Sequence, residues 1–129
     1  MIGLHARDIR NVLIITGDRP KMSPTYLRST AVFDLDSTTL IRYVYGLLNA
    51  GLDFGGQPLS RSAQPNTSFT IGSGYEPEAP NPEHELEKLR RKIDNGVDYI
   101  FTQPVFDESA LDKIEPFRQD VPIMPGVLV

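Results

Sequence analysis

Four short apolar runs, separated by segments with helical periodicity, constrain the fold of this chain more than any other feature of its sequence. The runs cover residues 12–15, 68–74, 98–102 and 121–129. Each run is mostly apolar and lacks the alternation of polar and apolar residues that a half-exposed strand shows. Strands of this kind are typical of a parallel sheet with both faces covered, in which helices supply the crossovers. The sequence therefore predicts an α/β fold built from parallel βα units.

The segments between the runs carry the start and stop signals of helices. Asp36 or Ser37 can cap a helix whose apolar residues recur at helical spacing, and Gly51 can end it. A charged helix further along the chain has Gly96 as its stop signal. The predicted helical segments are 4–10, 36–51, 77–96 and 106–119.

Length, charge and cysteine content exclude several classes of protein. The 129 residues predict a single domain, 1–129, which is shorter than the roughly 250 residues of a closed (β/α)8 barrel. The net charge of −4 and the dispersed basic residues argue against a nucleic-acid partner. Because no apolar segment approaches the roughly 20 residues of a membrane span, we expect no membrane partner. The chain has no cysteine, and the cytoplasm is the expected location.

Metal and dinucleotide motifs are missing from the sequence. His5 and His84 lie in predicted helices without carboxylate or histidine partners at ligand spacing, so we expect no metal site. No Gly-x-Gly-x-x-Gly pattern follows a predicted strand, which argues against a Rossmann dinucleotide site.

Glycines and polar residues gather where the predicted strands end. They occupy residues 16–18, 72–75, 102–104 and 125–126. Because parallel strands end at one rim, and ligands of α/β folds bind at that rim, we expect a ligand site there. Each residue also has a plain structural interpretation. Asp18 lies in a sequence that favours a turn and could be a turn residue. Gln103 could be a surface amide, and Tyr75 could be an aromatic ring at the edge of the core. Arg91 and Lys92 could lie on a solvated helix face.

Several longer segments of the sequence resemble methylenetetrahydrofolate reductase. They are DIRNVLIITGDRPKM, VFDLDSTTLIRYVYGLLNAGLDFGG, FTIGSGYEPEAP, LEKLRRKIDNGVDYIFTQPVFD and IMPGVLV, in this order. They are similar above all to the reductase half of bacterial proteins that fuse it to a homocysteine methyltransferase. The resemblance implies a partial (β/α)8 TIM barrel, about half a barrel, with strands four to seven. It also implies FAD-dependent reduction of 5,10-methylenetetrahydrofolate to 5-methyltetrahydrofolate, with NAD(P)H as the electron donor.

The resemblance also implies roles for individual residues. Asp18 matches an acid beside the flavin and the folate, where a carboxylate could stabilise positive charge that develops on the folate. Arg91 and Lys92 match a basic pair near the FAD diphosphate. Gln103 matches the glutamine that holds the pterin ring, and Phe106 would add an apolar wall to the folate site. The implied FAD-binding residues are Ile15, Thr16, Gly17, Asp18, Phe33, Ser73, Tyr75, Arg91 and Lys92.

The resemblance leaves parts of the reductase unmatched. Members of the family have three earlier strands, an eighth strand and an early glutamate that acts as the general acid, and none of these matches a segment of this chain. Half a barrel has two free sheet edges and one uncovered face, so we expect self-association or pairing with the missing half. One alternative is a non-catalytic half barrel that binds flavin or folate. Another is an unrelated open α/β domain of the flavodoxin type, which would bind a mononucleotide.

Overall fold

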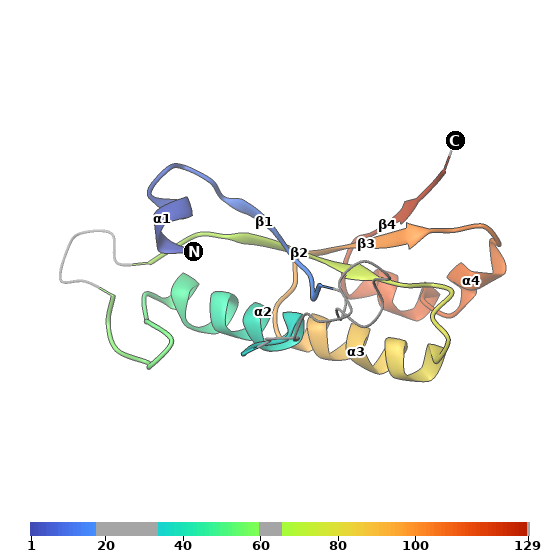
Figure 1. Cartoon of the computed structure of the whole chain (residues 1–129), viewed down its shortest axis with the longest axis horizontal. Helices are drawn as coiled ribbons and strands as arrows, with labels where there is room; N and C mark the ends of the chain where they lie inside the picture. Colours follow the sequence, from blue (N-terminus) through green and yellow to red (C-terminus); the bar gives the residue numbers. More distant parts are fainter. Residues whose placement is uncertain (18–33, 60–65, 129) are drawn as a thin grey trace, which may run out of the picture.

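Four parallel strands form one sheet in the order β1-β2-β3-β4. The computed structural model describes residues 1–17, 34–59 and 66–128. Each neighbouring pair of strands is joined through a helical crossover (Figure 1). The prediction of an α/β fold from parallel βα units is thereby confirmed, and the arrangement is consistent with part of a TIM barrel. The strands are β1 (Asn11–Ile14), β2 (Thr70–Tyr75), β3 (Tyr99–Pro104) and β4 (Ile123–Gly126).

A helix overlaps each of the four predicted segments, but all four are shorter than expected; the predicted helix 4–10 ends at His5, and the one predicted for 77–96 begins at Pro82. The helical segment that begins at Ser37 leaves α-helical geometry at Leu47 and finishes as a 3-10 turn before Gly51, which has a φ of 82°. The segment after β3 forms only two short pieces, because Pro116 cannot continue an α-helix. None of the helices in the described part of the chain is long and apolar enough to cross a membrane. The helices are α1 (Ile2–His5), α2 (Ser37–Gly46), η2 (Leu48–Ala50), α3 (Pro82–Asp94), α4 (Ser109–Asp112) and η3 (Glu115–Gln119).

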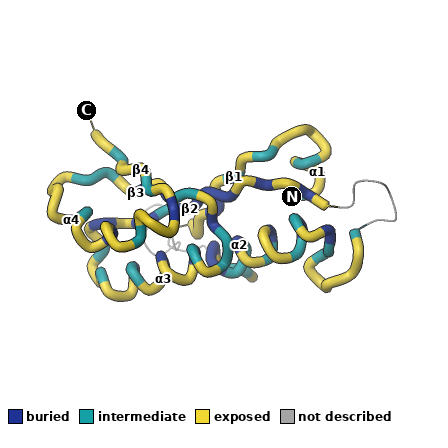
Figure 2. The backbone as a smooth tube through the Cα atoms, turned by 180° about the vertical axis from the view of Figure 1, so that it is seen from behind, coloured by how far each residue is buried: buried dark blue, intermediate teal, exposed yellow. Residues whose placement is uncertain are grey.

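The hydrophobic core lies between the sheet and the helices α2 and α3, which lie on the same side of it (Figure 1). Alternate strand residues point into this core, and the buried positions of strands and helices face one another in Figure 2. The residues of this core that are at most 1% exposed are Ile41 and Val44 of α2, Leu89 of α3, Ile71 of β2 and Ile100 of β3.

No helix of the described residues covers the other face of the sheet, so the expectation that both faces are covered is wrong, whereas the one uncovered face that the resemblance implies is found. Leu13 is 51% exposed, Ile15 62% and Phe101 44%. The topology explains this, because right-handed crossovers in a consecutive strand order place every crossover helix on the same face. A doubly wound sheet of the flavodoxin type needs a reversal of strand order, and the order 1-2-3-4 has none.

Asp36 caps α2, and replacing it by alanine should destabilise the fold by about 1 kcal/mol at neutral pH. Its Oδ1 accepts the Thr39 backbone N–H at 2.7 Å. The hydrogen bonds from Thr39 lower the pKa of Asp36 below that of an ordinary aspartate. The ionised cap therefore stabilises the fold above the unfolded pKa of about 4, and this contribution is lost as the pH falls through the lower folded pKa.

Urea denaturation at pH 7 and below pH 3 checks this prediction. The stability difference between wild type and Asp36→Ala should shrink at the lower pH. Asp34→Ala is the control, because Asp34 is exposed and lies just before the cap. A difference of the same size at both pH values would contradict the capping role.

Candidate functional site

The open face of the sheet leaves strand backbone uncovered at Gly74, near the carboxyl end of β2, whereas the ring of Tyr99 covers Gly72. A side chain at Gly72 would overlap the ring of Tyr99, whereas a Cβ at Gly74 would lie 3.6 Å from Cγ2 of Ile15. The rings of Tyr99 and Phe101 pack edge to face, with their centroids 5.4 Å apart. This face therefore offers rings, an aliphatic side chain and bare strand backbone to a ligand.

Two of the predicted FAD-binding residues lie on the opposite, helix-facing side of the sheet. Ser73 is fully buried, and its Oγ donates a hydrogen bond to the carbonyl of Ile14 at 2.7 Å. Tyr75 is 2% exposed, and its hydroxyl has no hydrogen-bond partner in the described part of the chain. Burial raises the pKa of Tyr75, and the carboxylate of Glu85 raises it further. These side chains point away from the open face because residues alternate between the two faces of a strand.

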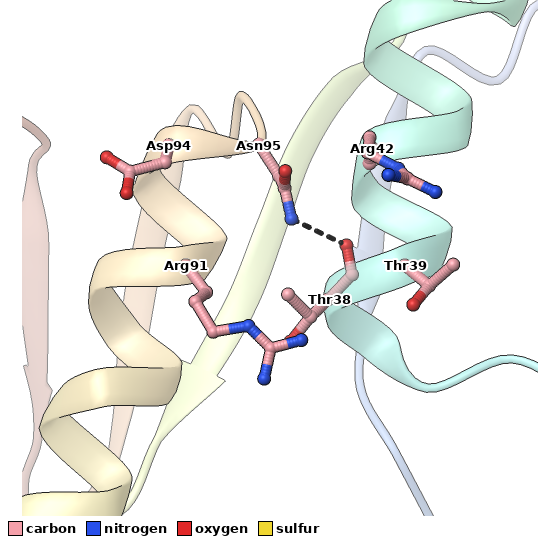
Figure 3. Close-up of a pocket in the computed structure, with 6 residues that line it drawn as sticks. All are labelled: Thr38, Thr39, Arg42, Arg91, Asp94 and Asn95. Atoms are coloured by element: carbon pink, nitrogen blue, oxygen red, sulfur yellow. Dashed lines mark hydrogen bonds between the residues drawn. The ribbon is translucent and has the colours of Figure 1, made fainter.

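The basic pair at the end of α3 is divided between solvent and core. Lys92 is 5% exposed, and its Nζ donates to the carbonyl of Gly74 at 2.5 Å. Burial lowers the pKa of Lys92, although the carboxylate of Glu85 opposes this change. Arg91, in contrast, is exposed. Figure 3 shows its guanidinium reaching from α3 toward Thr38 in α2.

Arg91 lines a polar groove between α2 and α3 (Figure 3). Across this groove Asn95 donates its side-chain amide to the carbonyl of Thr38 at 3.2 Å, which joins the two helices. The residues that line the groove are Thr38, Thr39, Arg42, Arg91, Asp94 and Asn95.

The first turn of α2 connects this groove to the end of β1. The Oγ1 of Thr16 accepts the Ser37 backbone N–H at 2.9 Å. The positive charges of Arg91 and Lys92 add to the hydrogen bonds from Thr39 in lowering the pKa of Asp36. Thr16, Asp36 and Arg91 therefore belong to one polar corner, formed by the end of β1, the start of α2 and the end of α3.

The structure brings only some of the predicted site residues together. Ile15 and Gln103 are exposed near the carboxyl ends of β1 and β3. Gly17 follows β1, and a Cβ added to it would meet no atom within 4 Å. Phe106 lies beyond β3 and is 72% exposed. Asp18 and Phe33 lie outside the described residues, so their predicted roles stay predictions.

Sequence reasoning missed the polar residues around Arg91. Asp36 was identified only as a helix cap, although its position before two threonines, Thr38 and Thr39, is the signal of a polar helix start. No local signal marks Asn95, which reaches Thr38 only because α2 and α3 pack together.

Comparisons with known proteins agree with the arrangement of the fold. A family model described as methylenetetrahydrofolate reductase matches residues 2–129. A protein of Schizosaccharomyces pombe named methylenetetrahydrofolate reductase 1 is 26% identical over 96% of this chain and 19% of its own length. Methylenetetrahydrofolate reductase 2 of Saccharomyces cerevisiae is 28% identical, over 92% of this chain and 18% of its own length. A rice protein named probable methylenetetrahydrofolate reductase (NADH) is 30% identical over 97% of this chain. The chain spans about a fifth of the length of these relatives.

Proposed function

Because the chain belongs to the methylenetetrahydrofolate reductase family, we propose that it forms part of a cytoplasmic oxidoreductase that reduces 5,10-methylenetetrahydrofolate to 5-methyltetrahydrofolate. FAD is the proposed cofactor, and NADH or NADPH the proposed electron donor. The observation that carries the proposal is the open sheet face, which has bare backbone at Gly74, apolar surface at Ile15 and an exposed amide at Gln103. These features lie at the carboxyl ends of parallel strands, where α/β proteins bind ligands.

The described residues fit FAD in two respects. Gly74 leaves room for a flat ring to approach the strand backbone, and Ile15 beside it is apolar and 62% exposed. The exposed guanidinium of Arg91 can form charge-assisted hydrogen bonds with a diphosphate. When bound, FAD supplies the hydride transfer that connects the nicotinamide to the folate.

In this proposal the other predicted site residues contact the folate substrate or border the cofactor. The amide of Gln103 can both donate to and accept from the pterin ring, and Phe106 can cover an apolar part of the folate. Thr16 and Gly17 border the cofactor. Asp18, outside the described residues, would stabilise positive charge on the folate. The predicted contact between Lys92 and the diphosphate stays a prediction. In this structure the Nζ of Lys92 donates to the carbonyl of Gly74.

A partner that covers the open face is the second part of the proposal. Four parallel strands with one uncovered apolar face are what half of an eight-stranded barrel would have, and β1 and β4 are the edge strands of the described sheet. A second copy of this chain, or the other half of the barrel, would cover this face and pair with these edges.

FAD titration of the purified 129-residue chain, followed by quenching of flavin fluorescence, tests the proposed function. We expect binding, and we expect Arg91→Ala to raise the Kd about tenfold or more through the loss of charge-assisted hydrogen bonds. Arg90→Ala is the matched control, because Arg90 pairs with Asp120 at 2.9 Å and packs over the ring of Phe117. Its Kd should equal that of the wild type.

Two outcomes would count against the proposal. A folded chain that binds no FAD would show that this piece holds no cofactor site by itself. Equal weakening by Arg90→Ala and Arg91→Ala would show that general charge, and not the polar corner, drives binding. If the chain binds FAD but does not turn over methylenetetrahydrofolate with NADH or NADPH, the alternative of a non-catalytic binding half barrel is favoured.

A further inference from the structure

The pairing between β3 and β4 goes out of step by one residue near the carboxyl ends of the strands. Phe101 pairs with Met124 and Pro104 with Gly126, so two residues of β3 lie opposite the single residue Pro125 of β4. The other neighbouring strands of the sheet pair in step. An extra residue of this kind is a β-bulge, which bends the strand and changes where its side chains point. Because proline has no N–H, neither Pro104 nor Pro125 can donate to the ladder, which explains why regular pairing stops here.

The hydroxyl of Thr102 bridges this bulge. Its Oγ1 accepts the backbone N–H of Gly126 at 2.9 Å and donates to the carbonyl of Gln103 at 2.7 Å. On the far side of the bulge, the N–H of Val105 donates to the carbonyl of Gly126 at 3.0 Å. Thr102 is 9% exposed, so its side chain satisfies backbone groups that lie away from bulk water. One side-chain hydroxyl therefore replaces the ladder bonds that the bulge interrupts.

The backbone of Gln103 is held by its neighbours on several sides. A Cβ at Gly126 would lie 2.8 Å from the carbonyl oxygen of Thr102 and 3.3 Å from the carbonyl carbon of Gln103, so only a glycine lets β4 lie this close. Pro104 restricts the residue before it to extended backbone conformations. The side chain of Thr102 is buried, whereas that of Gln103 is exposed. The contacts that fix the Gln103 peptide therefore leave its side-chain amide free.

We propose that Thr102 is a positioning residue, whose hydroxyl fixes the bulge and thereby aims the amide of Gln103 at a ligand on the open face of the sheet. An amide that donates and accepts at the same time needs a defined direction, because hydrogen bonds weaken steeply when they are misaligned. Thr102 itself does not touch the ligand. The part of this inference that concerns the ligand rests on the proposed function, in which Gln103 binds the pterin ring.

The first half of the test needs no ligand and uses nuclear magnetic resonance on the 129-residue chain. The amide of Gly126 should be protected from hydrogen exchange in the wild type. Thr102→Val keeps the shape of the side chain and removes its hydroxyl. It should speed this exchange about tenfold, the effect of losing about one hydrogen bond, and change the three-bond coupling that reports the φ of Gln103. Thr102→Ser keeps the hydroxyl and should restore both signals.

Thr67→Val is the matched control for the loss of a buried threonine hydroxyl. Thr67 is 6% exposed, and its Oγ1 donates to Oδ1 of Asn49 at 2.8 Å, before the start of β2. This variant should lower the stability of the chain and leave the signals of Gly126 and Gln103 unchanged.

The second half of the test is calorimetric titration of 5-methyltetrahydrofolate into the chain saturated with FAD. Thr102→Val should raise the Kd about tenfold, because the amide of Gln103 loses about one well-aligned hydrogen bond. Thr102→Ser and Thr67→Val should keep the wild-type Kd. In a Gln103→Ala background Thr102→Val should cause no further loss, since Thr102 acts through that amide.

The two halves separate the inference from the proposed function. A Gly126 amide that is unprotected in the wild type would overturn the inference, and so would exchange and coupling that are unchanged in Thr102→Val. An equal rise in Kd with and without the Gln103 amide would also overturn it. A merely structural threonine would change stability and leave the Kd unchanged. If the wild type binds no 5-methyltetrahydrofolate, the proposed function fails for this chain, and the resonance measurements still decide whether Thr102 holds Gln103.

Discussion

Replacing Gly96 by alanine is expected to lower the free energy of unfolding by about 2–4 kcal/mol. Gly96 has a φ of 94°, in the left-handed region that other residues rarely adopt. A Cβ there would also overlap the ring of Tyr45, which comes from α2. Backbone strain and steric overlap therefore add at this position, which connects the end of α3 to β3. Urea denaturation followed by circular dichroism measures the loss.

Two further variants separate the two causes. Tyr45→Ala in the Gly96→Ala background should recover the part that arises from the ring and leave the part that arises from φ. Gly46→Ala is the matched control, because Gly46 lies in α2 with no atom within 4 Å of its Cβ position, and alanine favours a helix. Gly46→Ala should leave the stability unchanged or raise it by up to about 1 kcal/mol. A Gly96→Ala variant as stable as the wild type would contradict the strain argument.

Replacing Ile100 by alanine is expected to lower the free energy of unfolding by about 2–5 kcal/mol. Ile100 is fully buried in β3, which lies between β2 and β4. The adjacent Phe101 is the control, because it points to the open face and is 44% exposed. In a monomer Phe101→Ala should have a much smaller effect than Ile100→Ala. Denaturation of both variants at low protein concentration measures this difference, and equal losses there would contradict a core on one face only.

The same pair of variants tests the proposed partner. If a second copy covers the open face, the thermal midpoint of the wild type rises with protein concentration. Phe101→Ala should then lose this concentration dependence, because the truncated side chain lies on the face that the copies would share. A monomer whose midpoint is independent of concentration would argue against self-association and leave the other half of the barrel as the proposed partner.

Local sequence signals predicted most of the secondary structure. The apolar run at 12–15 became β1 (Asn11–Ile14), and the charged segment with its stop at Gly96 became α3. The segment 106–119 was predicted as one helix, and this prediction was wrong. Pro116 lies inside the pattern, and its missing N–H and its ring divide the segment into α4 and η3.

The candidate site was harder to predict than the fold. That glycines and polar residues meet at the ends of parallel strands follows from pairing alone, and Ile15 and Gln103 do lie exposed near that end of the sheet. The segment 72–75 was treated as one rim, although its residues alternate between the two faces. Gly72 and Gly74 face the open side, whereas Ser73 and Tyr75 are buried toward the helices.

The sequence by itself determined most elements of this protein and the parallel pairing of its strands. Caps, glycines, prolines and apolar spacing act within a few residues, so they can be read without knowing the rest of the fold. The tertiary structure alone decided which sheet face is covered and which of two adjacent basic residues meets solvent. Both outcomes depend on side-chain direction. Right-handed crossovers in the order 1-2-3-4 place α3 against one face of the sheet. Because neighbouring residues of a helix point in different directions, Lys92 is then buried beneath Gly74 and Arg91 is exposed.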